Sequence, residues 1–332
     1  MRLPIILLGV IVLMVLGFVF VGGASPFISV APEVVFHAGP LAITNTMFTS
    51  WIVVIVLIAI AFIAGRGAKV VPSGFSGAVE AVIVVFYDIV VGVAGEKNGR
   101  RFFPVIATIF FFVLVSNYMG LLPINNVIGK PEPNHGVKQA VLEQSTIAGI
   151  DIAYIPLKPS TVDTGAGEPP IIAAEAGDTF SGVIAPYLRS VMTDVNAPLA
   201  IAIWSFIFVE FWGITAVGVS YFTKFFNFGR LIRFSPMGVI DVFVGLLELV
   251  SELSRTVSFT FRLFGNVFAG EVLLLMGMFL VPFVLVDVFY GLELFVGLIQ
   301  AFVFAMLTLV FAQTAVTFSH GNGHGEEHSA GH

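Results

Sequence analysis

Long uninterrupted apolar runs constrain the fold of this chain more than any other feature of its sequence. Residues 3–21, 47–64 and 102–122 contain no charged side chain, and about 20 apolar residues in a helix suffice to cross the hydrocarbon core of a bilayer. Of the 332 residues, 58% are hydrophobic and only 11% are charged, whereas about 25% are charged in an ordinary soluble domain. The sequence therefore predicts an all-α polytopic membrane protein.

The predicted membrane domain covers residues 25–320 and contains about five transmembrane helices. Pro236 begins a long helical stretch, and Pro282 interrupts the apolar sequence that follows it. Because proline breaks a helix, we expect the last two helices to form a long antiparallel hairpin that reverses near Pro282. The expected spans are residues 47–64, 102–122, 197–222, 236–281 and 285–318.

Residues 1–24 precede this domain and are predicted to form a signal peptide or an N-terminal anchor. The apolar run is long for a signal peptide, but the small residues Gly22, Gly23 and Ala24 favour a cleavable signal.

Residues 74–95 are long enough to span, yet their composition favours a helix that lies at the membrane surface. Glu80, Tyr87 and Asp88 share one helical face, which is typical of an interfacial amphipathic helix. If this helix does not cross, five Lys and Arg residues within 66–101 fall on one side. The positive-inside rule then makes that side cytoplasmic.

Two other segments are polar. Residues 124–192 are rich in Pro, Gly, Asp and Glu and are predicted to be a mostly irregular external loop. Asp194, at the mouth of the next span, fits either a residue near a helix N-terminus or an ion-entry role. Residues 321–332 form a His-rich tail; its spacing could suit a metal, but its glycines and terminal position favour a disordered, solvated tail.

A polar stripe crosses the apolar sequence between residues 248 and 271. At about 100° per residue its central members lie within roughly 40° of one line on a helix, with polar residues flanking them. Ionisable groups at membrane depth are costly and indicate function. The stripe and its flanks consist of Glu248, Ser251, Glu252, Arg255, Ser258, Arg262 and Asn266.

Composition excludes several classes of function. There is no cysteine, so thiolate catalysis and Cys-based metal sites are absent. No phosphate-binding Gly loop of the P-loop type is found, and no basic cluster suits nucleic acid. We therefore expect no cofactor, no metal and no nucleotide site in this chain.

The motif RLFGN at residues 262–266, followed by Glu271 nine residues after Arg262, resembles the ion-translocating subunit a of the F-type ATP synthase. The resemblance extends to FFFVLVSNYMGLLP at residues 110–123, to TDVNAPLAIA at residues 193–202, and to Gln300 in the last helix. It covers roughly residues 40–320, but not most of the loop between Asn125 and Arg189.

This resemblance implies a subunit without a catalytic site of its own, in a bacterial inner membrane. The implied partners are a rotating c-ring, subunit b of the peripheral stalk, the other ATP synthase subunits and membrane lipid, but no nucleic acid. Arg262 would act on the carboxyls of the c-ring. The resemblance also implies an outer half-channel lined by Glu271 and Glu293, support of the Arg region by Asn266 and Gln300, and an inner half-channel near Glu248, Ser251 and Ser258.

The chemistry of the arginine side chain fits a permanent positive charge at Arg262. A guanidinium does not deprotonate in proteins, so it can attract a carboxylate on a partner but cannot relay a proton. Arg255 on the same stripe fits pairing with Glu252, snorkelling or a gating role. A secondary transporter or an ion channel with an intramembrane Arg/Glu site is the alternative, although no internal repeat is found. The sequence leaves H⁺ and Na⁺ open as the coupling ion.

The expected hairpin also predicts how deep its polar side chains lie in the membrane. Glu271 lies eleven residues before Pro282 and Glu293 eleven after it, so both carboxyls should sit at one level, about 16 Å from the turn. Arg262 and Gln300, twenty before and eighteen after, should share a deeper level.

Overall fold

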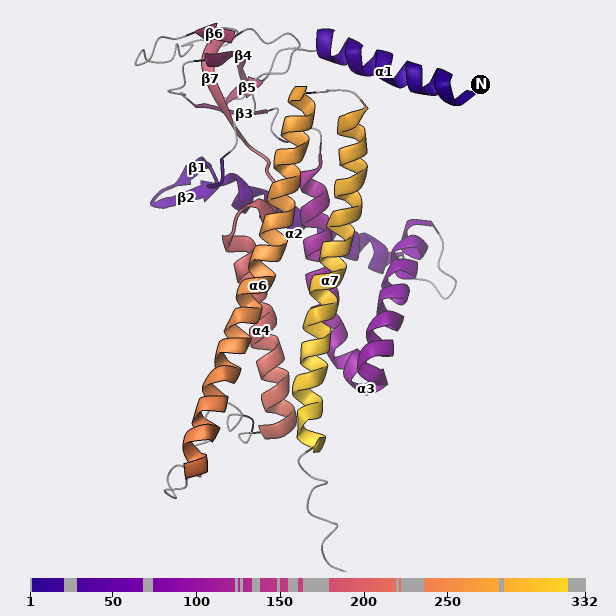
Figure 1. Ribbon diagram of the computed structural model, residues 1–332, viewed down its shortest axis with the longest axis vertical. Helices are drawn as coiled ribbons and strands as arrows, with labels where there is room; N and C mark the ends of the chain where they lie inside the picture. Colours follow the sequence, from indigo (N-terminus) through magenta and orange to yellow (C-terminus); the bar gives the residue numbers. More distant parts are fainter. Residues whose placement is uncertain are drawn as a thin grey trace, which may run out of the picture. The chain divides into compact units, whose positions relative to one another are not determined.

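The computed structural model is mostly helical (Figure 1). Five helices within the described residues are long and apolar enough to cross a membrane, namely α2, α3, α4, α6 and α7. This confirms the all-α polytopic architecture. The helices are α1 (Arg2–Phe20), α2 (Asn45–Arg66), α3 (Gly74–Gly120), α4 (Asn196–Val217), α6 (Pro236–Leu280) and α7 (Leu285–Gly321). The structure describes residues 2–20, 29–67, 74–122, 125, 128–132, 138–147, 150–154, 161–163, 179–218, 221, 236–280 and 284–321.

The chain divides into two compact units, and each long helix of the C-terminal hairpin contributes to both. The first unit comprises Met1–Val56, Leu114–Asp194 and Phe264–Ile299. The second comprises Leu57–Val113, Val195–Leu263 and Gln300–His332.

Helices α6 and α7 form the predicted antiparallel hairpin (Figure 1). In the first unit, Gly277 of α6 faces Phe289 of α7. In the second unit, Phe259 of α6 packs on Phe304 of α7 with ring centroids 5.1 Å apart. The earlier residue of α6 thus contacts the later residue of α7, as expected for an antiparallel pair.

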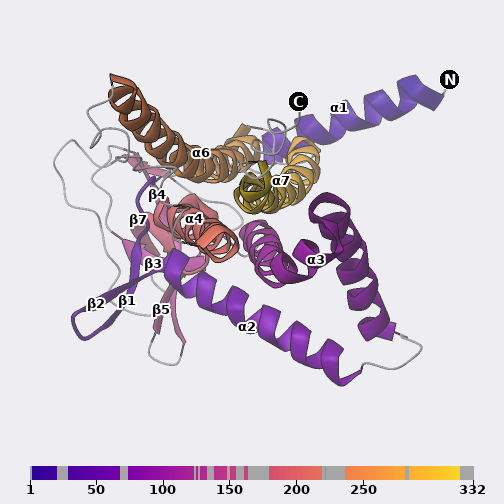
Figure 2. The ribbon, with the colours of Figure 1, turned by 90° about the horizontal axis from the view of Figure 1, so that it is seen from below.

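Helix α3 consists of two segments that meet at Gly95. This residue has φ 75°, a conformation that only glycine adopts at little cost, and it is where the helix is kinked. Figure 2 shows α3 bending back on itself along its length. The two segments pack on each other, since the rings of Phe86 and Phe110 stack with centroids 4.4 Å apart. A separate helix over the first segment is therefore confirmed, and its place at the membrane surface stays a prediction.

The prediction of a mostly irregular loop at residues 124–192 was wrong in its described parts. Strands β3, β7, β4 and β5 pair in turn, and β5 also pairs with β3, so these four strands close on themselves. The Pro and Gly content of the segment obscured these strands. Ile147 of β4 pairs with Ile150 of β5 at the end of their antiparallel ladder. The strands are β3 (Ile128–Glu132), β4 (Lys138–Ile147), β5 (Ile150–Tyr154), β6 (Thr161–Asp163) and β7 (Thr179–Pro186).

A small hairpin of β1 (Val34–Ala38) and β2 (Leu41–Thr44) leads directly into α2. Asn45 at the start of α2 is fully buried, and its side-chain amide donates to the carbonyl oxygen of Pro186 at 3.2 Å. The first turn of α2 is thereby bonded to the end of the inserted sheet. The predicted cleavage region at residues 22–24 and nearly all of the His-rich tail lie outside the described residues.

Candidate functional site

The polar stripe lies along helix α6, at the boundary between the exposed side and the buried side of the helix. Ser251, Ser258, Arg262 and Asn266 are exposed, whereas Glu248 is half-buried. The exposed side of α6 is otherwise strongly apolar, and in water so large an apolar surface would be unfavourable. Its exposed large side chains include Ile240, Phe243, Val244, Leu247, Val250, Val257 and Phe261.

Arg262 has no hydrogen bond or ion pair with any described residue. Its guanidinium carbon lies 5.8 Å from the ring centroid of Phe259, which is at the outer limit of a cation–π contact. Gln300 on α7 is half-buried and makes no hydrogen bond to Arg262. The predicted Arg262–Gln300 level therefore stays a prediction, and the cation is available to a partner outside the described chain.

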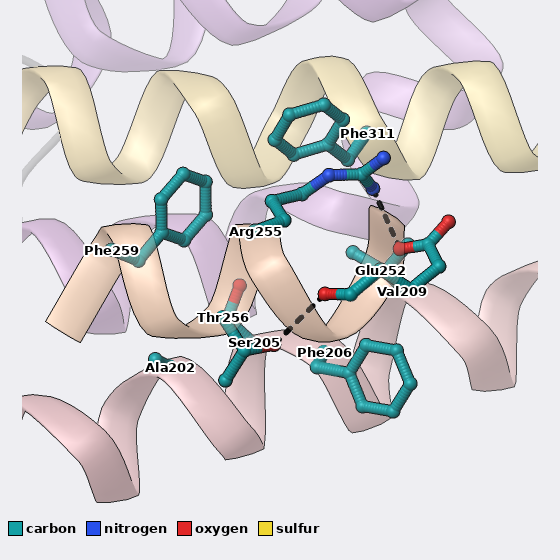
Figure 3. Close-up of a pocket in the computed structure, with 9 residues that line it drawn as sticks. All are labelled: Ala202, Ser205, Phe206, Val209, Glu252, Arg255, Thr256, Phe259 and Phe311. Atoms are coloured by element: carbon teal, nitrogen blue, oxygen red, sulfur yellow. Dashed lines mark hydrogen bonds and ion pairs between the residues drawn. The ribbon is translucent and has the colours of Figure 1, made fainter. Parts of the chain in front are cut away.

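Arg255, about two helical turns before Arg262, is engaged within the chain (Figure 3). Its Nη1 lies 2.8 Å from Oε2 of Glu252, whose side chain is 4% exposed. The guanidinium carbon sits 3.7 Å from the ring centroid of Phe311 on α7. Of the three roles considered for Arg255, the structure shows pairing with Glu252.

This ion pair borders a small pocket between α4, α6 and α7 within the second unit (Figure 3). Nearby, the hydroxyls of Ser205 on α4 and Thr308 on α7, both buried, lie 2.8 Å apart. These two buried hydroxyls thus satisfy each other, as a low-dielectric interior favours. The pocket is lined by Ala202, Ser205, Phe206, Val209, Glu252, Arg255, Thr256, Phe259 and Phe311.

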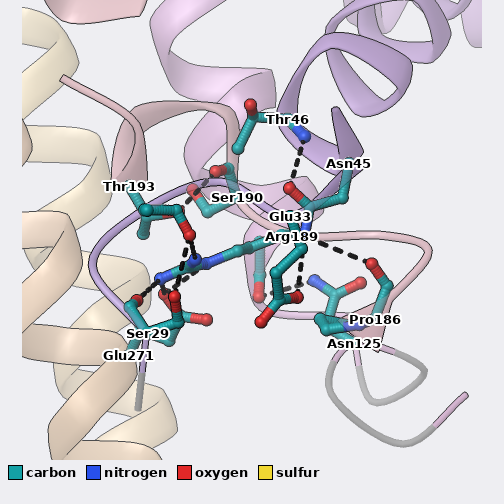
Figure 4. A network of polar contacts seen from close by, with 12 residues as sticks. Ser29, Glu33, Asn45, Thr46, Asn125, Pro186, Arg189, Ser190, Thr193 and Glu271 are labelled. Carbon is teal, nitrogen blue, oxygen red and sulfur yellow. Dashed lines mark hydrogen bonds and ion pairs between the residues drawn. The ribbon is translucent and has the colours of Figure 1, made fainter. Parts of the chain in front are cut away.

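In the first unit, Glu271 of α6 forms an ion pair with Arg189 (Figure 4). The Nη2 and Nε atoms of Arg189 lie 3.2 Å and 3.3 Å from Oε2 of Glu271. The side chains are only 5% and 14% exposed. Arg189, near the end of the insertion, was not predicted from the sequence as a site residue. The one available signal was a lone Arg just before a transmembrane span, because a buried cation needs an acidic partner.

Glu293 of α7 faces α6 one residue before Glu271. Its carboxylate sits directly against Gly270 of α6, the residue before Glu271, in space that a Cβ on Gly270 would occupy. The structure therefore brings the predicted carboxyls Glu271 and Glu293 to adjacent positions on the hairpin.

The side-chain amide of Asn117 on α3 donates to the carbonyl oxygen of Gly297 on α7 at 3.1 Å, so a motif residue of α3 holds α7 in place.

Asp194 lies in the same unit and is buried. Its Oδ2 accepts a hydrogen bond of 3.1 Å from the hydroxyl of Thr46 on α2. The residue just before α4 is Val195, which makes no side-chain cap. Asp194 lies one residue earlier, and both interpretations of its role stay predictions. Within the described ranges, no group of three or more His, Asp and Glu residues could hold a metal ion.

Comparison with known proteins gives one consistent result. The family model described as ATP synthase A chain matches residues 47–313. The ATP synthase subunit a of Moorella thermoacetica is 27% identical over 88% of this chain and 99% of its own length. That of Syntrophobacter fumaroxidans is 25% identical over 88% and 92%, and that of Gloeobacter violaceus 28% over 89% and 94%.

Proposed function

We propose, because the chain belongs to the ATP synthase A chain family, that it is the ion-translocating subunit of the membrane sector of an ATP synthase. The matched region includes the whole polar stripe and both carboxyls of the hairpin. In this role it would join ion flow across the membrane to ATP synthesis carried out by other subunits.

The observation that supports this function best is the state of Arg262. It is a permanent cation at an exposed position of α6, a helix that also exposes large apolar side chains such as Val257 and Phe261. A charge at membrane depth needs a partner, and no described residue supplies one. A membrane-embedded carboxyl on a rotating c-ring is a partner of the right sign, and the apolar surface suits the ring and lipid.

The ion path follows from this arrangement. A ring carboxyl opposite Arg262 is held in its charged form by the opposite charge. Once it moves away, it meets a half-channel, takes up an ion and can then face lipid as a neutral group. Direct passage is blocked, because the fixed cation lies between the two half-channels. We assign Glu271 and Glu293 to the outer half-channel and Glu248, Ser251 and Ser258 to the inner one. Asn266 and Gln300 would support the Arg region between them.

The remaining assignments are part of the same proposal. The partners are the c-ring, subunit b of the peripheral stalk, the other ATP synthase subunits and lipid, and the location is the bacterial plasma membrane. Residues 1–24 form the signal or anchor, residues 25–320 the membrane domain, and residues 321–332 the tail.

Purification followed by a pumping assay tests this function. The chain should copurify with a complex that hydrolyses ATP, and inverted vesicles should acidify or take up Na⁺ when ATP is added. A homo-oligomer that conducts ions without ATP would favour the channel, and ion-coupled solute uptake by the chain alone would favour the transporter.

A further inference from the structure

Arg189 is held by an unusually complete set of contacts for a residue near the end of an insertion. Besides its two hydrogen bonds to Glu271, it donates from Nη1 to the carbonyl oxygen of Ala31 at 3.3 Å. Its Nη2 donates to the carbonyl oxygen of Ser29 at 2.6 Å, and its backbone N–H to Oγ1 of Thr49 at 3.2 Å. All of these residues belong to the first unit.

These contacts satisfy the hydrogen-bonding groups of the buried Arg189–Glu271 pair. A buried ion pair is stable when geometry is good and the remaining hydrogen-bonding groups are satisfied, and removal of one partner leaves an uncompensated charge. Here the guanidinium fork reaches one carboxylate and two backbone carbonyls (Figure 4). Glu271 is thus bound by a cation that cannot give up its proton.

Glu293 has a different environment, although its carboxylate lies against the neighbouring residue Gly270. It is half-buried, and among the described residues it has no hydrogen bond or ion pair. A carboxyl that is not bound to a fixed cation can gain and lose a proton without breaking an ion pair. The two acids of the hairpin are therefore chemically unequal.

We propose that Arg189 is a positioning residue that makes Glu271 a fixed carboxylate, so that Glu293 is the acid that exchanges the ion at this level. The inference rests on the proposed function, since it divides roles within the outer route. Within the pair, the charge of Glu271 is compensated by that of Arg189. The pair also attaches α6 to the segment at residues 29–31 and to the chain that follows β7.

Paired variants test this division. Arg189→Gln and Glu271→Gln each leave a buried charge without its partner, so each should lower ATP-driven uptake into inverted vesicles by about tenfold or more. The double variant R189Q/E271Q removes both charges and should pump several-fold faster than either single variant. Arg189→Lys keeps the charge but not the fork, so its rate should lie between wild type and Arg189→Gln. Glu293→Gln should stop uptake even though the pair is intact.

The controls use the exposed pair Arg100–Glu96, whose side chains are 71% and 64% exposed. Arg100→Gln and E96Q/R100Q should stay within about twofold of wild type, since surface pairs contribute little. The amount of subunit in the purified complex is measured for every variant. If the single variants fail to assemble, recovery of assembly by the double variant supports the pair.

Several outcomes would overturn the inference. They are a double variant no better than the single ones in pumping or assembly, wild-type pumping by Arg189→Gln, and wild-type pumping by Glu293→Gln. Failure of the proposed function is separate, because it would show as continued pumping by Arg262→Ala, whatever the behaviour of Arg189.

Discussion

The carboxylate of Glu293 on α7 lies directly against the backbone of Gly270 on α6, in space that a side chain at position 270 would fill. The contact requires glycine at position 270, because the side chain of any larger residue would displace the Glu293 carboxylate. It also fixes the level at which the two helices of the hairpin meet in the first unit.

Gly270→Ala should therefore impair ion uptake while the subunit still assembles. The added methyl group meets only the carboxylate end of the flexible Glu293 side chain, so it should move the acid from its place at little cost in stability. We expect ATP-driven uptake into inverted vesicles to fall several-fold. Gly291→Ala is the matched control, since a Cβ there would meet no atom within 4 Å, and it should behave as wild type. Equal activity of the two variants would show that the position of Glu293 does not matter for transport.

The Glu252–Arg255 pair should contribute to stability. Because Glu252 is buried and bonded to Arg255, Glu252→Ala leaves a partly buried cation unpaired, at a cost of about 3 kcal/mol or more. The measurement is the temperature at which the detergent-solubilised subunit aggregates, which should fall clearly for Glu252→Ala. Leu253→Ala, at an exposed neighbouring position, should change it little. A similar shift for both variants would argue that the pair has no special role.

The hairpin register can be tested by cross-linking, because the chain has no native cysteine. Cysteine pairs at 271/293 and at 262/300 should form disulfides or short-linker cross-links. A pair at 266/285 should not, since in this register the partner of residue 266 lies about 18 Å further along α7. Cross-linking of 266/285 in preference to 271/293 would show that the register is wrong.

The sequence predicted the helical architecture and the hairpin because both depend on strong, local signals. Apolar runs of membrane length specify spans, and one proline located the reversal closely enough to place Glu271 and Glu293 together. Gly95 was not recognised as the turn within α3, although a glycine at the boundary between a helix and a basic segment was visible. The stripe on α6 followed from periodicity alone.

The sequence predicted the inserted segment and its contacts poorly, and the reasons are physical. Strands of mixed composition, such as KQAVLEQSTI in β4, do not alternate regularly between apolar and polar residues, so β3 to β7 were missed. Arg189 meets Glu271, 82 residues away, and nothing in the local sequence specifies a partner at that distance. The pairing of Arg255 was foreseen only because Glu252 lies three residues before it on the same helix.

Arg262→Ala tests the central claim most directly. The variant complex should assemble in normal amount, because Arg262 has no ion pair or hydrogen bond with the described residues whose loss would destabilise the chain. ATP-driven ion uptake into inverted vesicles and ATP synthesis by energised vesicles should both be abolished, with Arg100→Gln as the control that retains both. Wild-type uptake by the assembled Arg262→Ala complex would contradict the account.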